Sequence, residues 1–278
     1  MKQSESWNYL LIDSHHQEEF ANVLPACLAE GGNTCAIGVY DDEGHVLGAI
    51  AYRCEGFHYY IEWIFVDPAV RRKGIGTTLI RKVFSIIGGT GERYPVICQV
   101  PFTEQEPDLY YFLLTQQCAD LFFSHDRYCL KPEEIREVED LHRKGNLTLE
   151  QKSFFDLSDM EQKKILQQMD QEQIFSVAYM ERWNEGYIPS LCRVIYVNNT
   201  LMNLIFVKTL PDGNLKLELL YSKYLRGLEE LLLSAVKEME STYPDKELVF
   251  DAVSEESRRL ARRLFPHARV THIYEGEW

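Results

Sequence analysis

The 278-residue chain is 45% hydrophobic and carries a net charge of -14 at pH 7. Its length suits two domains with ample cores, and its acidic surface argues against a nucleic acid partner because it repels phosphate backbones. No apolar run approaches the roughly 18 residues that cross a bilayer, and the polar start lacks the apolar core of a signal peptide. We therefore expect a cytoplasmic protein without a membrane partner.

Strand and helix patterns alternate along the first half of the chain. β-rich runs and amphipathic runs predict, in order, strands over 35–40, 45–53 and 59–66, a helix over 77–87, a strand over 95–100, a helix over 108–118 and a strand over 126–130. Pro68 ends the third strand, because proline cannot donate to a ladder. A first domain therefore closes near residue 130.

A highly charged segment, residues 131–150, follows and has the composition of a connector. Beyond it, Ser158 and Glu161 have the spacing of a helix capping box. Later patterns predict strands over 190–197, 201–209 and 215–221, a helix over 228–239, a strand over 247–253, a helix over 255–265 and a strand over 269–274. Because this order repeats that of residues 35–130, we expect an internal duplication.

A basic loop with two glycines lies between the strand over 59–66 and the next helix. Gly74 and Gly76 let backbone N–H groups approach an anion without a Cβ in the way. The start of the helix supplies unpaired donors and a partial positive charge. Three cations complete the loop: Arg71, Arg72 and Lys73. This loop predicts a site for a diphosphate.

The segment resembles the signature of the GNAT N-acetyltransferases, which reads Arg or Gln, two residues, Gly, one residue, then Gly or Ala. Arg71, Gly74 and Gly76 match it, and Val66-Asp67-Pro68 matches the family's usual approach to the loop. The resemblance implies that acetyl-coenzyme A (acetyl-CoA) is the acetyl donor. The loop amides would hold its pyrophosphate, and the backbone of the preceding strand would pair with its pantetheine arm. The cofactor-binding residues expected on this basis are Phe65, Val66, Arg71, Arg72, Lys73, Gly74, Ile75, Gly76, Thr77 and Thr78.

The resemblance covers roughly residues 35–130. Residues 150–278 resemble the family in the order of their elements but not in the signature, because the matching stretch, 222–228, holds one glycine where a spaced pair is required. The implied fold is α/β (α+β), with two GNAT-like domains, each a mixed, mostly antiparallel sheet flanked by helices. We place a catalytic domain that binds acetyl-CoA at 1–130, the connector at 131–150 and a degenerate domain without a cofactor site at 151–278.

Acetyl transfer to an amine needs a base that deprotonates the amine and an acid that protonates the leaving thiolate. Glu62 is the expected base, because it is a carboxylate in an otherwise apolar strand and the family often places a glutamate there. It lies four residues before Val66, so strand alternation puts both on one face, although that face could equally be solvated. For the acid, the resemblance points to Tyr111 or Tyr110. Aromatic residues of such a helix are also ordinary core residues.

Other interpretations of the loop fit less well. A dinucleotide fingerprint would need a third glycine at Leu79, and a P-loop would need Gly-Lys-Ser or Gly-Lys-Thr after four spacer residues. A plain basic turn at a helix start stays open. The cysteines and histidines show no ligand spacing, so we expect no metal.

The predicted function is an N-acetyltransferase that moves the acetyl group of acetyl-CoA directly to a primary amine of a small molecule or peptide. The alternative from another class is a non-catalytic acyl-CoA sensor or interaction module, which keeps the loop without the acid and base. A transferase for a longer acyl chain is a further interpretation. The sequence leaves open the identity of the acceptor and assembly as a homodimer.

Overall fold

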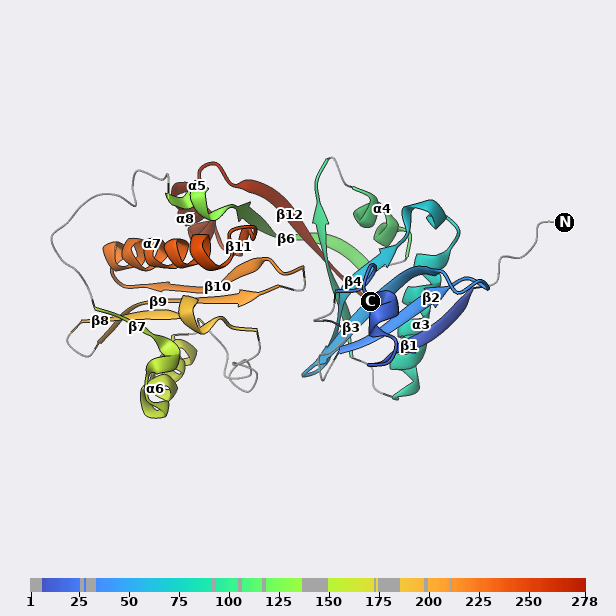
Figure 1. The fold of residues 1–278 in the computed structure, drawn as a ribbon, viewed down its shortest axis with the longest axis horizontal. Coiled ribbons are helices and arrows are strands. Elements are labelled where there is room, and N and C mark those ends of the chain that lie inside the picture. The colour runs from blue at the N-terminus through green and yellow to red at the C-terminus, as the bar shows by residue number, and fades with distance from the viewer. Residues whose placement is uncertain are drawn as a thin grey trace. The chain divides into compact units, whose positions relative to one another are not determined.

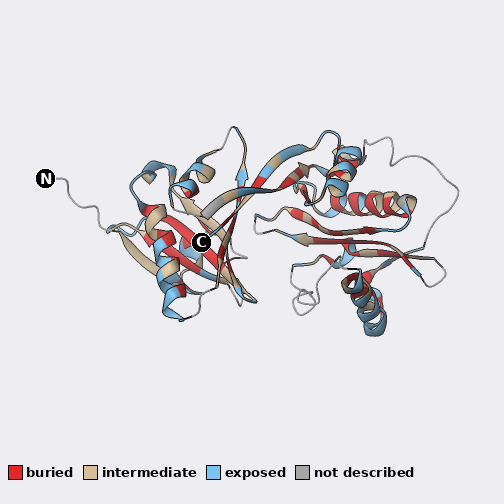
Figure 2. Cartoon of the chain, turned by 180° about the vertical axis from the view of Figure 1, so that it is seen from behind, coloured by how far each residue is buried: buried red, intermediate tan, exposed pale blue. Residues whose placement is uncertain are grey.

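The computed structural model describes residues 7–25, 28, 34–91, 94–104, 107–116, 119–136, 150–172, 174, 186–197, 200–210 and 212–278 (Figure 1). The chain divides into two units, Met1–Ser124 with His272–Trp278, and His125–Thr271. Each is built around six neighbouring strands. Buried residues run through the middle of the strands and follow one side of the long helices, as Figure 2 shows.

The strands of the first unit follow one another in the order β1-β2-β3-β4-β5-β12. They are β1 (Asn8–Ile12), β2 (Thr34–Tyr40), β3 (Val46–Glu55), β4 (His58–Val66), β5 (Val96–Phe102) and β12 (Arg269–Glu277). Neighbouring strands are antiparallel, apart from β4 and β5, which are parallel. The result is the mixed, mostly antiparallel arrangement that the sequence predicted.

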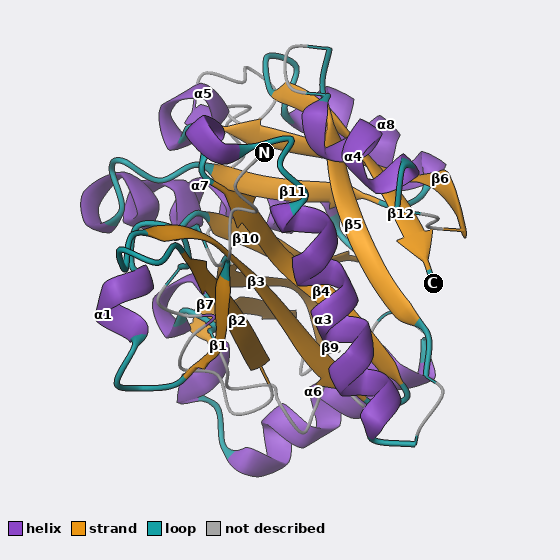
Figure 3. Ribbon diagram, turned by 90° about the vertical axis from the view of Figure 1, so that its right-hand side faces the viewer, coloured by secondary structure: helices purple, strands orange, loops and turns teal. Residues whose placement is uncertain are grey.

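Helices lie on both faces of these strands (Figure 3). They are α1 (Gln17–Phe20), the 3-10 turn η1 (Pro68–Val70), α3 (Ile75–Gly89) and α4 (Asp108–Leu114). Leu79 and Val83 on the apolar stripe of α3 are buried against one face, and Phe20 of α1 is buried against the other. α4 ends at Leu114, earlier than residue 118 where the sequence predicted its end.

The second unit repeats this plan with the strand order β6-β11-β10-β9-β8-β7. The strands are β6 (Ala119–Leu130), β7 (Gln151–Ser153), β8 (Arg193–Val197), β9 (Thr200–Thr209), β10 (Leu215–Ser222) and β11 (Leu248–Ala252). β10 and β11 are parallel, and the other neighbouring pairs are antiparallel. The parallel pair therefore has the same place in the order as β4 and β5 in the first unit.

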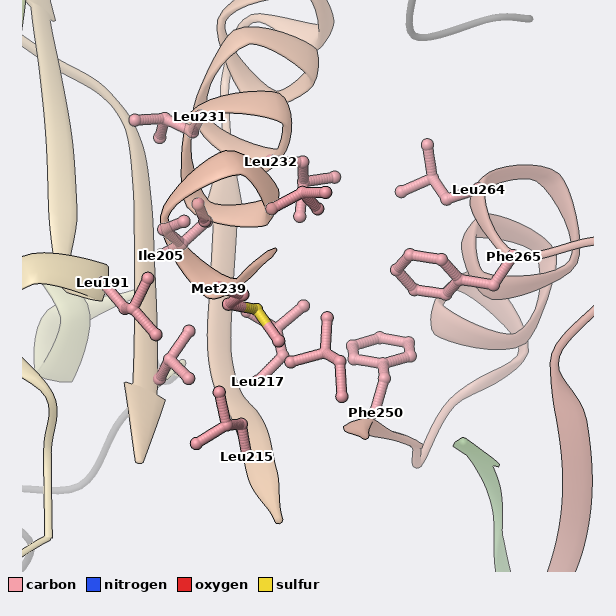
Figure 4. Close-up of a cluster of buried hydrophobic side chains, with 14 of the residues drawn as sticks. Leu191, Ile205, Leu215, Leu217, Leu231, Leu232, Met239, Phe250, Leu264 and Phe265 are labelled. Atoms are coloured by element: carbon pink, nitrogen blue, oxygen red, sulfur yellow. The ribbon is translucent and has the colours of Figure 1, made fainter. Parts of the chain in front are cut away.

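Helices again cover both faces of the second unit's strands. They are α5 (Pro132–Arg136), η3 (Phe154–Asp156), α6 (Asp159–Gln171), η5 (Pro189–Leu191), α7 (Leu225–Thr242) and α8 (Glu255–Leu264). The predicted capping box starts α6, where Ser158 N donates to Glu161 Oε2 at 2.9 Å and Glu161 N donates to Ser158 Oγ at 3.4 Å. Figure 4 shows Leu232 and Met239 of α7 near Phe250 and Phe265 in a shared core. No helix in the described part of the chain is long and apolar enough to span a membrane.

The two halves of the chain exchange their last strands. β12 pairs with β5 through His272–Glu277, and β6 pairs with β11 through Asp126–Leu130. The compact units therefore differ from the predicted ranges 1–130 and 151–278, because residues 125–130 and 272–278 each change unit. Of the predicted connector, Pro132–Arg136 forms α5, and residues 137–149 lie outside the described part.

One β-bulge interrupts each strand that leads to the long helix of its unit. In β4, Trp63 pairs with Ala51 and Ile61 pairs with Tyr52, so Glu62 is the extra residue. Ile61 consequently packs on the α3 side and Trp63 on the α1 side, although they are two residues apart. In β10 the extra residue is Glu218, between Leu217 and Leu219.

Candidate active site

The parallel strands β4 and β5 separate where the candidate site begins. Their register covers Tyr59 to Ile61 of β4, and the strands are not paired beyond it. A cavity of about 740 Å³ opens there, between the end of β4, the loop before α3, and α4. This volume lies within the 300–1,000 Å³ that is usual for small-molecule sites.

The loop before α3 has the geometry of an anion cradle. Arg72 and Gly74 both adopt left-handed backbone conformations, with φ of 67° and 87°. The first intrahelical bond joins Thr78 N to Gly74 O at 3.0 Å, so the amides of Ile75, Gly76 and Thr77 precede it. Gly74 has no side chain to cap them, and they face the region where the helix dipole favours negative charge.

The two glycines of the loop are required for different reasons. An added Cβ at Gly74 would meet nothing within 4 Å, so the residue is needed for its positive φ. An added Cβ at Gly76 would lie 3.0 Å from Cζ of Phe112 on α4. Gly76 therefore allows α4 to pack closely on the start of α3, a reason that the sequence alone did not give.

Two arginines beside the cavity, Arg71 and Arg72, favour an anionic ligand. In this structure both contact one carboxylate, that of Asp108 at the start of α4: its Oδ2 lies 3.8 Å from Arg71 Nη1, and its Oδ1 lies 3.6 Å from Arg72 Nη2. Arg71 Nε also donates to the carbonyl of Val66 at 3.0 Å. The side chains of Arg72 and Asp108 are 80% and 69% exposed, so their ion pair is weak and a diphosphate can displace the carboxylate.

Most of the expected cofactor-binding residues line the cavity. Those that do are Phe65, Val66, Arg71, Arg72, Gly74, Ile75, Gly76 and Thr77. Lys73 and Thr78 do not: Lys73 Nζ lies 5.9 Å from the ring centre of Trp7, and Thr78 Oγ1 donates to Gly74 O at 3.1 Å. The sequence analysis missed Asp108 and Phe112, whose i, i+4 spacing on α4 would have indicated a common face, and Gln116, which lies just after α4.

Glu62 is not among the residues that line the cavity, which on β4 are Ile64, Phe65 and Val66; it lies in a charged group on β3 and β4. Its Oε1 accepts a hydrogen bond from Arg53 Nε on β3 at 2.7 Å. Arg53 also pairs with Glu55, and its guanidinium lies 5.2 Å from the ring centre of Tyr60. The side chain of Glu62 is 23% exposed, so this carboxylate is partly withdrawn from water and held by one arginine.

The expectation that Glu62 and Val66 share a face is wrong, because the bulge at Glu62 shifts the alternation of β4. Val66 packs with the cluster under α3, whereas Trp63 packs with the opposite cluster. Arg53 binds Glu62 while lying over Tyr60, which follows the α3-facing Tyr59 and so points the other way. Glu62 therefore lies on the side of Tyr60 and Trp63.

Neither expected acid is among the residues that line the cavity. Tyr111 is 55% exposed. The ring of Tyr110 packs against Phe102 and Tyr274, with centroids 5.0 and 4.9 Å away. The cavity side of α4 instead carries Leu109 and Phe112, which are about one helical turn apart.

The second unit has a much shorter connection at the matching place. β10 ends at Ser222 and α7 begins at Leu225, whereas β4 ends at Val66 and α3 begins at Ile75. Asn203 Nδ2 stabilises this short connection by donating hydrogen bonds to Ser222 Oγ and to Tyr224 O, both at 2.8 Å. Nothing in it corresponds to the left-handed residues of the first unit's loop.

One group of side chains away from the cavity has metal-ligand chemistry, which the sequence analysis did not anticipate. Asp41, Glu43 and His45 in the turn between β2 and β3 have ligand atoms within 4.8 Å of one another. Glu43 and His45 are exposed. Hydrogen bonds from the His45 backbone and, less strongly, its ring hold the pKa of Asp41 below its usual value.

Comparisons with known proteins agree with this geometry. The sequence model of the Acetyltransferase (GNAT) family matches residues 3–113, and no curated protein matches the chain. The fold is similar to that of a tandem GNAT protein from the clavulanic acid biosynthesis pathway, with a TM-score of 0.69 and 13% identity over 98% of each chain. It is also similar to a GCN5-related N-acetyltransferase from Sphaerobacter thermophilus, with a TM-score of 0.60 and 14% identity over 97% of this chain and 95% of that one.

Residues 3–113 match the GNAT family, and the chain as a whole carries two GNAT folds in tandem. The predicted family and fold class are thus confirmed. Acyl transfer is the general chemistry of this family, whose members generally use acetyl-CoA and amine acceptors.

Proposed function

We propose that the first unit is an N-acetyltransferase that transfers the acetyl group of acetyl-CoA directly to a primary amine of a small molecule or peptide in the cytoplasm. The cavity between the separated ends of β4 and β5 carries this proposal, because the signature loop forms one of its walls. A cavity beside an anion-binding loop suits acetyl-CoA, in which a narrow pantetheine arm is joined to a diphosphate.

The loop and the end of β4 would bind the two parts of the donor. The amides of Ile75 to Thr77 and the cations Arg71 and Arg72 hold the diphosphate. The backbone of Phe65 and Val66 holds the pantetheine arm. Acetyl-CoA supplies an activated thioester, so no covalent intermediate on the protein is needed.

Glu62 would act as the base. It accepts the proton of the incoming amine as the nitrogen attacks the thioester carbonyl, directly or through one water. Arg53 fixes the orientation of the carboxylate. The C–S bond then breaks, and Tyr110 or Tyr111 returns a proton to the thiolate. Separate Tyr110→Phe and Tyr111→Phe variants test this role: of the two, the variant that removes the acid should lower turnover substantially, and the other should not.

The test is release of coenzyme A with a panel of primary amines, measured with the full chain. Amine-dependent release supports the transferase. Tight acetyl-CoA binding without release for any amine would instead support the non-catalytic sensor, and release that is faster with longer acyl donors would support the longer-chain transferase.

A further inference from the structure

The two units differ in what lies beside the glutamate of the β-bulge. In the second unit, Lys216 Nζ lies 3.0 Å from Oε2 of the bulge residue Glu218 and 2.9 Å from Asp251 Oδ2. Burial alone would lower the pKa of Lys216, but the charges of these two carboxylates raise it. The second unit therefore binds a primary ammonium of its own chain beside the bulge glutamate.

The first unit has no such ammonium among its described residues. Tyr60 of β4 and Lys216 of β10 both lie two residues before the bulge, and each pairs with the parallel neighbouring strand. Tyr60 therefore takes the place of Lys216. Glu62 Oε1 accepts from Arg53 Nε, whereas Glu62 Oε2 contacts no cation in the described ranges. This second oxygen lies where the proposed function needs the amine of the acceptor.

The face that carries Glu62 continues onto β5 and β12. On β5, Cys98 packs in the cluster under α3, so its neighbour Gln99 points to the other side, that of Tyr60. Gln99 pairs with Glu275 on β12, and its Nε2 donates to Glu275 Oε2 at 3.4 Å. Glu275 forms no ion pair within the part of the chain that the structure describes. Its carboxylate is therefore a second anionic group on the face of Glu62.

The second unit has a cation where the first has Glu275. Counted from the parallel pairs, Asp251 on β11 occupies the place of Gln99. Arg127 on β6 pairs with Asp251 and so occupies the place of Glu275. Arg127 Nε donates to Asp251 Oδ1 at 2.7 Å. The second unit thus balances its carboxylates with cations of its own chain, whereas the first unit carries a further carboxylate at the matching place.

We propose that the acceptor is a linear aliphatic diamine, whose reacting ammonium lies at Glu62 Oε2, as Lys216 lies at Glu218, and whose second ammonium binds Glu275. The proposal rests on the proposed function, because acetyl transfer at Glu62 is what brings an acceptor to this face. Neighbouring strands lie about 4.8 Å apart, so β4 and β12, on either side of β5, place the two backbone positions about 10 Å apart. Glu275 is then a specificity-determining residue that the second half of the chain contributes to the first unit.

The reaction acetylates one end of the diamine. The nitrogen at Glu62 loses a proton and attacks the thioester, an N–C bond forms and the C–S bond breaks. The products are the mono-N-acetylated diamine, coenzyme A with a proton on its sulfur, and one proton released to solvent. The distal ammonium keeps its charge throughout, so its contact with Glu275 contributes to binding and not to the chemical step.

The experiment compares coenzyme A release by the full chain with putrescine and with butylamine, which have the same carbon chain but differ in the second ammonium. We expect kcat/KM to be about tenfold higher for putrescine, mainly through a lower KM, as one charge-assisted contact implies. Glu275→Gln should bring the two amines to within about twofold of each other. The control Glu256→Gln removes the same charge from an exposed position on α8 and should keep the preference.

A charge reversal sharpens the test. Glu275→Arg copies the cation of the second unit, so it should favour γ-aminobutyrate, which has a carboxylate in place of the second ammonium, over putrescine. Equal use of putrescine and butylamine by the unmodified protein, or a preference that survives Glu275→Gln, would overturn the proposal and leave the transferase intact. Absence of coenzyme A release with every amine would refute the proposed function and this proposal with it, so the two failures are distinguishable.

Discussion

Glu218 occupies in β10 the bulge position that Glu62 occupies in β4. Each accepts contact from a cation on the neighbouring antiparallel strand: Arg53 Nε lies 2.7 Å from Glu62 Oε1, and Lys208 Nζ lies 2.9 Å from Glu218 Oε1. The second unit keeps this pair although it lacks the signature loop. The bulge glutamate therefore has a structural role in both units. Of the two glutamates, only Glu62 lies in a unit with the signature loop and could also act in catalysis.

This relationship supplies a matched pair of variants for the base. Glu62→Gln should lower turnover by roughly two orders of magnitude with little change in acetyl-CoA affinity, the typical scale of general-base loss. Glu218→Gln should leave turnover within about twofold of the original, because it removes ion pairs with Lys208 and Lys216 from a unit without the signature loop. Steady-state kinetics and calorimetry measure both effects.

Retained turnover would contradict the role of Glu62 as the base. If the two variants lose similar stability in urea and both keep their turnover at neutral pH, Glu62 is a structural residue of the bulge. The sensor function then gains support over the transferase.

A second prediction concerns the positive φ at Gly74. Gly74→Val should abolish acetyl-CoA binding while the chain still folds, because a β-branched residue resists a φ of 87° and the loop amides then lose their arrangement. Gly44→Val is the matched control, since Gly44 has a φ of 86°, and an added Cβ there also meets nothing within 4 Å. Calorimetric titration should give normal binding for the control; binding by a folded Gly74→Val protein would remove the loop from the site.

Gly76→Val should differ from Gly74→Val in stability. Its Cβ meets the ring of Phe112 at 3.0 Å, so α4 must shift as well as the loop. We expect a loss of about 1–3 kcal/mol in the free energy of unfolding together with lost binding. The double variant Gly76→Val with Phe112→Ala should recover part of that stability, and equal instability of the single and double variants would contradict the contact.

A third prediction is the stoichiometry of the donor. Acetyl-CoA should bind with one site per chain, because two residues, Lys223 and Tyr224, replace the cradle between β10 and α7. Calorimetric titration of the full chain measures this directly. Two sites of comparable affinity would show that the short connection still binds a diphosphate.

A fourth prediction concerns pH and Asp251 on β11, whose side chain is 10% exposed. Burial alone would raise its pKa, but the adjacent His125 ring, with Nε2 3.4 Å from Oδ1, the hydrogen bonds from Arg127 and the charge of Lys216 hold the pKa well below the usual value of about 3.9. The folded state therefore binds fewer protons than the unfolded state near that pH. The resulting stability is fully present above pH 4 and is lost as the pH falls through the lower, folded-state pKa.

The variant Asp251→Asn tests the direction of this pH dependence of stability. At pH 7 it should lower the free energy of unfolding by about 3 kcal/mol, because it leaves Lys216 and Arg127 partly buried without their shared anion. The difference from the original protein should shrink as the pH falls below about 4. Asp245→Asn, at an exposed position, should have no such pH-dependent cost in urea titrations. A constant difference across this range would contradict the low pKa.

The sequence by itself determined the features that depend on neighbouring residues. Gly74 at a helix start, Ser158 three residues before Glu161, and Pro68 after a β-rich run act through local backbone chemistry. Such signals need no knowledge of distant parts of the chain. The family, the order of the elements and most of the loop that lines the cavity were therefore predictable from the sequence.

The tertiary structure decided what depends on pairing partners. The face of Glu62 was not predictable, because a bulge is defined by the register with β3 and one extra residue reverses the alternation. The exchange of β6 and β12 was likewise invisible, since residues far apart in the chain compete for the open edges of β5 and β11. A strand's own pattern encodes that it needs a partner, and only the packing of the whole chain selects which partner it takes.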